Sequence, residues 1–142
     1  MGLFAKLFGT VEEPARDYAR SRAQDVSAAP GKSWGRKMPA EENQYSFRGG
    51  YEEYFATVFY DAFPGYEIDR AYPREDAVVF RFLLEGRPVL VVEIMSERSS
   101  AKKLRDDCRA QGIAYLRFYH DHAGWWNTRS YVTERVRRAL EG

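Results

Sequence analysis

The stretch RPVLVVEIMSERSSAKKLRDDCRAQGIAYLRFYH, which spans Arg87 to His120, contains the elements that decide the fold. Residues 88–95 form an apolar run that is broken only by Glu93, and such a run is typical of a buried strand. An unpaired carboxylate in an apolar environment is very costly, so Glu93 needs a metal ion, a cationic side chain or water beside it. The identity of that partner distinguishes the candidate functions of this chain.

A helix and a second strand follow this first strand. Residues 101–111 carry apolar side chains at helical spacing, serines precede them, and Gly112 follows them, so we expect a helix that ends at Gly112. The apolar run 113–119 predicts the second strand. Because a helix connects them, the two strands are expected to be parallel neighbours in one sheet.

The flanking sequence completes an α/β pattern. A helix is predicted over 51–62, and Pro64 and Gly65 end it. Strands are predicted over 66–72 and 77–84, and a hairpin turn is predicted at Glu85 and Gly86. A final helix begins at Thr128 or Ser130. The predicted fold is therefore a three-layer α/β domain. It has a mixed four-stranded sheet, the order α-β-β-β-α-β-α, and helices on both faces of the sheet.

The first fifty residues read differently from this domain. Leu3, Phe4, Leu7 and Phe8 form the apolar stripe of a short amphipathic helix, and the residues that follow are rich in proline, glycine and polar side chains, with a second short helix possible over 13–24. We therefore divide the chain into an N-terminal helix and extended arm or linker, 1–50, and an α/β domain, 51–142. Residues 1–12 are a candidate contact for a partner protein.

Composition excludes several classes of protein. The single cysteine, Cys108, rules out an internal disulfide, and no apolar run approaches the ~20 residues of a membrane span. No targeting segment is apparent, so a cytoplasmic protein without membrane insertion is expected.

Charge is distributed unevenly along the chain, although the net charge is only +1. Residues 51–96 carry nine acidic and four basic side chains, a net charge of −5, whereas residues 97–142 carry six acidic and ten basic, a net charge of +4. This asymmetry fits a metal site beside a phosphate-binding face. It fits equally well two halves of one fold that neutralise each other.

The acid on its apolar strand, together with the element order, resembles the PD-(D/E)XK superfamily of restriction-endonuclease-like nucleases. The resemblance covers about residues 51–140. It implies that acids on two neighbouring strands bind a divalent metal and that a lysine two residues after the second acid positions the attacking water. In this chain Met95 occupies the lysine position, which implies a degenerate site.

The resemblance also assigns candidate residues. Asp76 and Glu93 are the candidate metal ligands, Glu52 on the first helix is the accessory acid, and Lys102 is a displaced catalytic base. An active site of this type would use Mg²⁺ or Mn²⁺. The competing interpretation makes Glu93 a buried carboxylate that a neighbouring arginine neutralises, with Arg81, Arg98 or Arg117 as candidates.

Other residues are candidates for contact with DNA or RNA, because aromatic rings stack on bases and basic side chains pair with phosphates. They are Arg98, Lys102, Lys103, Trp125, Trp126 and Arg129. The alternative is that the tryptophans anchor the last helix or the arm. Arg135, Arg137 and Arg138 are read as a solvated helix face or a weak phosphate patch. His120 and His122 could bind a metal or lie in an exposed loop.

Three functions remain. The first is a degenerate nuclease-like domain, impaired in catalysis, that acts as a binding or regulatory module on nucleic acid. The second is an active metal-dependent nuclease, and the third is a protein-interaction domain. The stretch GIAYLRFYHDHAGWWNTRSYVTERV also looks like the end of a small uncharacterised bacterial family, a resemblance that implies no activity.

Overall fold

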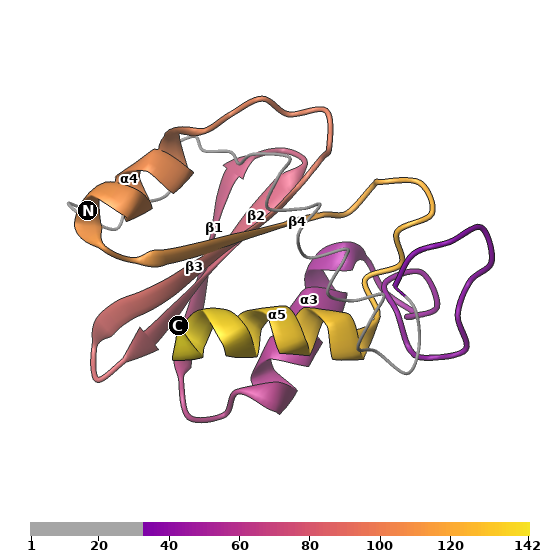
Figure 1. Cartoon of the computed structure of the whole chain (residues 1–142), viewed down its shortest axis with the longest axis horizontal. Helices are drawn as coiled ribbons and strands as arrows, with labels where there is room; N and C mark the ends of the chain where they lie inside the picture. Colours follow the sequence, from indigo (N-terminus) through magenta and orange to yellow (C-terminus); the bar gives the residue numbers. More distant parts are fainter. Residues whose placement is uncertain (1–32) are drawn as a thin grey trace.

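The order of helices and strands follows the alternation of apolar patterns in the sequence. A computed structural model describes residues 33–142 (Figure 1). Its elements are α3 (Tyr51–Ala62), β1 (Glu67–Arg74), β2 (Ala77–Leu84), β3 (Arg87–Met95), α4 (Lys103–Gln111), β4 (Ala114–Tyr119) and α5 (Arg129–Glu141). The predicted order is confirmed. The predicted helices at Leu3–Phe8 and 13–24 lie outside the described residues.

The four strands form one mixed sheet in the order β1-β2-β3-β4. Strand β2 lies between β1 and β3 and is antiparallel to both. Glu85 and Gly86, with φ values of 53° and 80°, make the tight turn between β2 and β3. Strand β4 is parallel to β3, as its crossover through α4 predicts.

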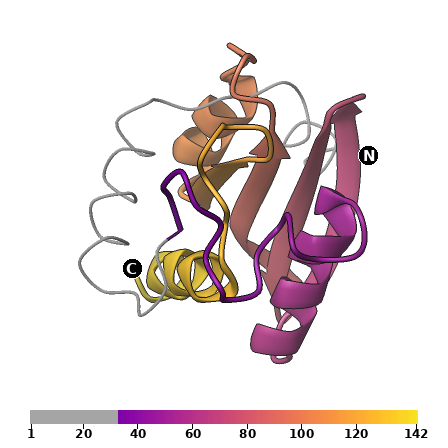
Figure 2. The same ribbon diagram turned by 90° about the vertical axis from the view of Figure 1, so that its right-hand side faces the viewer.

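The two faces of the sheet are covered by different helices (Figure 2). Leu90, Val92 and Ile94 of β3 point toward α3 and α5 and belong to the large aromatic core. Val91 lies on the opposite face, where it packs with Leu104 and other apolar residues beneath α4. Since side chains alternate along a strand, Glu93 shares the α4 face with Val91.

The segment 33–50 is held against the loop that leads into α5. Trp34 and Trp125 form an isolated antiparallel bridge, and the Gly35 N–H donates to the Gly124 carbonyl at 2.8 Å. At the start of α5, the Ser130 N–H donates to the Glu41 carboxylate at 2.8 Å, where an acid is favourable to the helix dipole. Part of the predicted arm thus caps the last helix.

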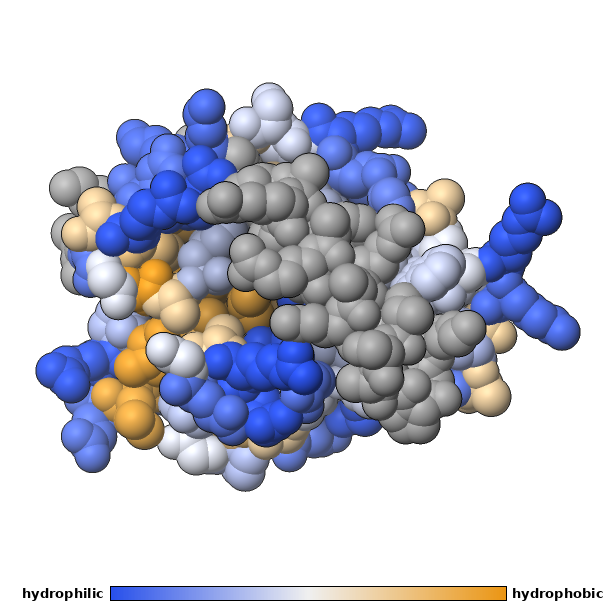
Figure 3. Space-filling model, in the orientation of Figure 1, coloured by the Kyte–Doolittle hydropathy of each residue, from blue (hydrophilic) through white to orange (hydrophobic). Residues whose placement is uncertain are grey.

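Polar side chains face the solvent on the helices. Figure 3 shows hydrophilic atoms over the outer surfaces of α4 and α5, with hydrophobic atoms visible between the two helices. Within the described part of the chain, no helix is long and apolar enough to cross a membrane.

Candidate functional site

Glu93 lies at the centre of a buried ionic cluster between the sheet and α4. Its side chain is 0% exposed, and Arg74 Nη2 donates to Oε2 at 2.8 Å. The Tyr115 hydroxyl donates to Oε1 at 2.5 Å, and Arg117 Nη2 lies 3.6 Å from the same oxygen. Both carboxylate oxygens are therefore occupied by protein donors.

A β-bulge brings Arg74 to Glu93. Ala71 pairs with Val79 but Arg74 pairs with Ala77, so β1 contains one residue more than β2 between these pairs. The extra residue turns Arg74 onto the α4 face, whereas regular alternation would point it toward α3. Pro73, which cannot donate to a strand ladder, lies inside the irregularity on an edge strand.

Arg117 joins the cluster from the neighbouring parallel strand. It pairs with Glu93 in the register of β3 and β4, and its side chain is 2% exposed. Its Nε donates to the Tyr115 hydroxyl at 3.1 Å and its Nη2 to the Ala101 carbonyl at 3.2 Å. Arg117 was one of three predicted partners of Glu93, while Arg81 pairs with Asp69 at 2.9 Å.

Burial is the main influence on the protonation of Glu93. It raises the pKa of this carboxyl, and the hydrogen bonds from Tyr115 and Arg74, together with the charge of Arg117, only partly oppose the rise. The ionised form of Glu93 therefore depends on its two arginines.

The other predicted acids lie elsewhere. Glu52 lies in the first turn of α3 on the opposite face of the sheet, where it accepts hydrogen bonds from Arg70 and from the Tyr72 hydroxyl, both at 2.6 Å. Asp76 lies in the β1–β2 turn, and its backbone carbonyl is 2.7 Å from His120 Nε2. Among residues 33–142 no group of three His, Cys, Asp or Glu side chains is arranged to hold a metal ion.

The two histidines of the β4–α5 loop have separate partners. The His120 ring stacks on Tyr51 with centroids 4.0 Å apart, and His122 Nδ1 lies 2.5 Å from a Glu97 oxygen. Asp121 between them accepts from the Ser96 hydroxyl at 2.6 Å and from the Glu97 N–H at 2.8 Å. Burial opposes ionisation of Asp121, but these hydrogen bonds outweigh it and lower its pKa.

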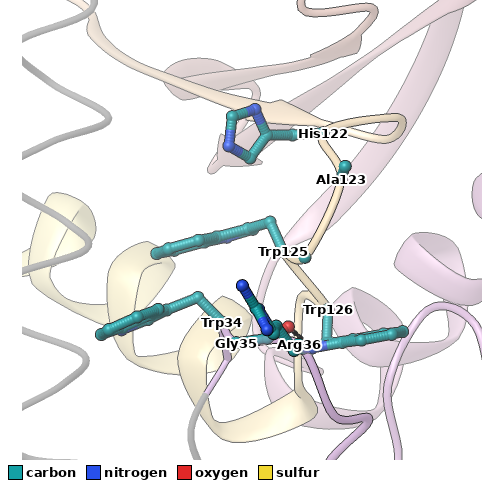
Figure 4. A pocket seen from close by; sticks show the side chains of 8 residues that line it. Trp34, Gly35, Arg36, His122, Ala123, Trp125 and Trp126 are labelled. Carbon is teal, nitrogen blue, oxygen red and sulfur yellow. Dashed lines mark hydrogen bonds between the residues drawn. The ribbon is translucent and has the colours of Figure 1, made fainter.

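The predicted tryptophans line a hollow of about 550 Å³ where the segment 33–36 meets the β4–α5 loop (Figure 4). Trp34, Trp125 and Trp126 all contribute to its wall, together with Arg36 and His122. A second hollow of about 560 Å³ shares Trp34 and Arg36 with it and extends along Lys37. Trp34, Arg36 and Lys37 were missed as site residues because their segment reads as a linker.

The predicted basic residues differ in their surroundings. Arg98, Lys102 and Lys103 are exposed in the loop before α4 and at its first residue, and the neighbouring Glu97 links this loop to His122 of the hollow. Arg129 lies 3.0 Å from Glu42 and 3.7 Å from Asp61, so its charge is already balanced.

No protein-family model matches the chain, and comparison with curated proteins and with solved structures gave no match. Function is therefore inferred from the contacts described above and from the predicted resemblance.

Proposed function

We propose that this chain is a nuclease-like domain that has lost metal-dependent cleavage and now acts as a nucleic-acid-binding module. The element order and the mixed sheet support the predicted relation to the PD-(D/E)XK superfamily, in which this architecture carries the active site. The surroundings of Glu93 support the loss of catalysis.

The observation that carries the proposal is the pairing of Glu93 with Arg74 and Arg117. In the predicted family this acid binds a divalent cation. Here two guanidinium groups take the cation's place, and the cluster of one carboxylate and two arginines already has a net charge of +1. A divalent ion would have to displace hydrogen-bonded donors and enter a positive environment, which electrostatic repulsion opposes.

Met95, two positions after Glu93, also supports the loss of catalysis. Met95 is 0% exposed, and its Sδ lies 4.0 Å from Arg74 Nη2. A thioether carries no charge and cannot orient a water molecule for attack as a lysine would. Lys102, the candidate displaced base, is exposed on the loop before α4.

Binding is supported by basic side chains that no acid within the described residues neutralises. Arg98, Lys102 and Lys103 are exposed and form no ion pair with another residue of 33–142. Such side chains release counterions when they contact phosphates, so affinity for nucleic acid would fall steeply with salt.

The test combines metal titration, cleavage and binding on the full chain. Calorimetry with Mg²⁺ or Mn²⁺ should show no binding, and single- and double-stranded DNA and RNA should remain intact. Labelled oligonucleotides should bind, with an affinity that decreases as salt rises.

Two results would overturn the proposal. Metal-dependent cleavage that disappears in Glu93→Gln would identify an active nuclease. A chain that binds no nucleic acid at low salt would not be a nucleic-acid-binding module.

A further inference from the structure

We infer that the hollow lined by Trp34, Trp125 and Trp126 accepts an unpaired base of single-stranded nucleic acid, while Arg36 and Lys37 contact the adjoining phosphates. This inference rests on the proposed function and names the ligand and the surface that would carry it.

The aromatic wall is built from two distant parts of the chain. Trp34 belongs to the segment before α3, and Trp125 and Trp126 belong to the β4–α5 loop. In Figure 4 the rings of Trp34 and Trp126 lie on either side of the Arg36 side chain, and His122 lies beyond Trp125. The volume of about 550 Å³ falls within the range of ~300–1,000 Å³ that small-molecule sites occupy.

Contacts behind the hollow fix its shape before any ligand arrives. The Trp126 Nε1 donates to the Gly35 carbonyl at 3.0 Å, and the Trp126 backbone N–H donates to the Ser33 carbonyl at 2.6 Å. Trp125 is 2% exposed and meets Tyr131 edge-on, with centroids 5.2 Å apart. Trp34 and Trp126 are only partly buried, and their rings point in opposite directions in Figure 4. The Trp126 ring packs edge-on against Tyr45, so Trp34 is the ring on which a base can stack beside Trp125. A fixed wall loses little entropy when a base stacks on it.

The charges beside the hollow suit phosphate. Arg36 and Lys37 are exposed, and neither forms an ion pair with a residue of 33–142. Glu97, which contacts His122 of the hollow, is paired with that imidazole. Because Arg36 borders both hollows, it is positioned to contact a backbone that passes from one to the other.

The chemistry favours single strands without base preference. Every base has an aromatic face that can stack on indole, so stacking tolerates any sequence. In a duplex the base faces are covered by their neighbours, and a base would have to leave the stack to enter the hollow. We therefore expect an oligothymidylate to bind more tightly than a duplex of equal length.

Intrinsic fluorescence tests the inference directly, because all three tryptophans of the chain line this hollow. Titration of the full chain with a 12-nucleotide oligothymidylate should quench tryptophan emission to saturation. Trp34→Ala should weaken binding by roughly tenfold, as expected for loss of one stacking partner. Trp34→Phe should restore much of the affinity.

The charge contribution is measured separately. Arg36→Ala with Lys37→Ala should lower affinity and reduce the salt dependence, the slope of log K against log salt, by about 1.4 for two lost phosphate contacts on a single strand. The matched control is Arg87→Ala, an exposed arginine at the opposite end of β3 from the β4–α5 loop, which should leave both quantities unchanged. These exposed substitutions do not depend on the fold tolerating a change at Trp34.

The outcomes separate the two proposals. Binding without quenching, equal affinity for the duplex, or full affinity in Trp34→Ala would overturn the hollow as the site and leave the binding module standing. Absence of binding to any oligonucleotide would overturn both.

Discussion

Arg74 lies 2.8 Å from the carboxylate of Glu93, although regular alternation along β1 would place it on the other face of the sheet. The bulge between Ala71 and Arg74 makes this contact possible. The extra residue of the bulge thus lets Arg74 place a positive charge beside the buried carboxylate of Glu93.

Replacement of Arg74 should destabilise the fold. Arg74→Ala leaves Glu93 with Arg117 alone, and we expect a loss of about 2 kcal/mol in the free energy of unfolding. This is less than the ~3–5 kcal/mol for breaking a fully buried pair, because Arg74 is 24% exposed and Arg117 remains. Urea denaturation at pH 8 measures the loss. Arg137→Ala, which removes two exposed ion pairs on α5, with Glu134 and Glu141, is the control and should change stability little.

Glu93 should make stability depend on pH. Its pKa in the folded state is raised above the ordinary value of 4.5, so the folded protein binds this proton more tightly than the unfolded chain does. Its contribution is therefore most favourable below pH 4.5 and decreases as pH rises through the folded-state pKa. Stability of the wild type relative to Glu93→Gln should fall over that interval, and carbon-13 NMR of the carboxyl should titrate above 4.5. A midpoint below 4.5 would show that the arginines outweigh burial.

The thiol of Cys108 should resist labelling in the native state. Cys108 is 0% exposed on the side of α4 that packs against the sheet, and burial, aided by Asp107 and Glu93, raises its pKa to about 12. A thiolate-directed reagent at pH 8 should therefore react only when this helix opens. The rate should increase in Arg74→Ala, which loosens the same layer, and labelling should be complete in denaturant. Rapid native labelling would contradict the packing of α4.

Gly124 should be sensitive to any side chain. Its φ is +79°, and a Cβ would lie 3.3 Å from the Gly35 carbonyl oxygen. Gly124→Ala should cost about 1–2 kcal/mol in the free energy of unfolding and shift the tryptophan emission, because it strains the contact with the segment 33–35. Gly86→Ala is the matched control, since its φ of +80° is similar but nothing lies within 4 Å. An equal cost at both positions would show that only backbone conformation matters.

Regular hydrophobic periodicity made the architecture predictable. The apolar runs 77–84 and 88–95, joined by the turn residues Glu85 and Gly86, predicted a hairpin, and the helix between 88–95 and 113–119 predicted the parallel pairing of those two strands. Helix α4 begins at Lys103, two residues later than predicted, because the Ser99 hydroxyl accepts from the Ala101 N–H in a local turn rather than capping the helix.

Long-range contacts could not be read from local patterns. Pro73 is the only feature of the local sequence that indicates the bulge between Ala71 and Arg74, and nothing local indicates that the bulge directs Arg74 to Glu93. Arg135, expected on a solvated face of α5, is 6% exposed, donates to the Arg117 carbonyl at 2.8 Å and stacks over Phe118. A long apolar stem lets arginine occupy such a position when its head group finds acceptors.

The bridge between the segment 33–35 and the β4–α5 loop also constrains the order of folding. Gly35 and Trp126 are 91 residues apart, so their hydrogen bond closes a long stretch of chain at a large entropic cost. During synthesis Gly35 must wait for this partner until Trp126, 91 residues later in the chain, has left the ribosome. We therefore expect the tryptophan environment to mature late in refolding, after the sheet has formed.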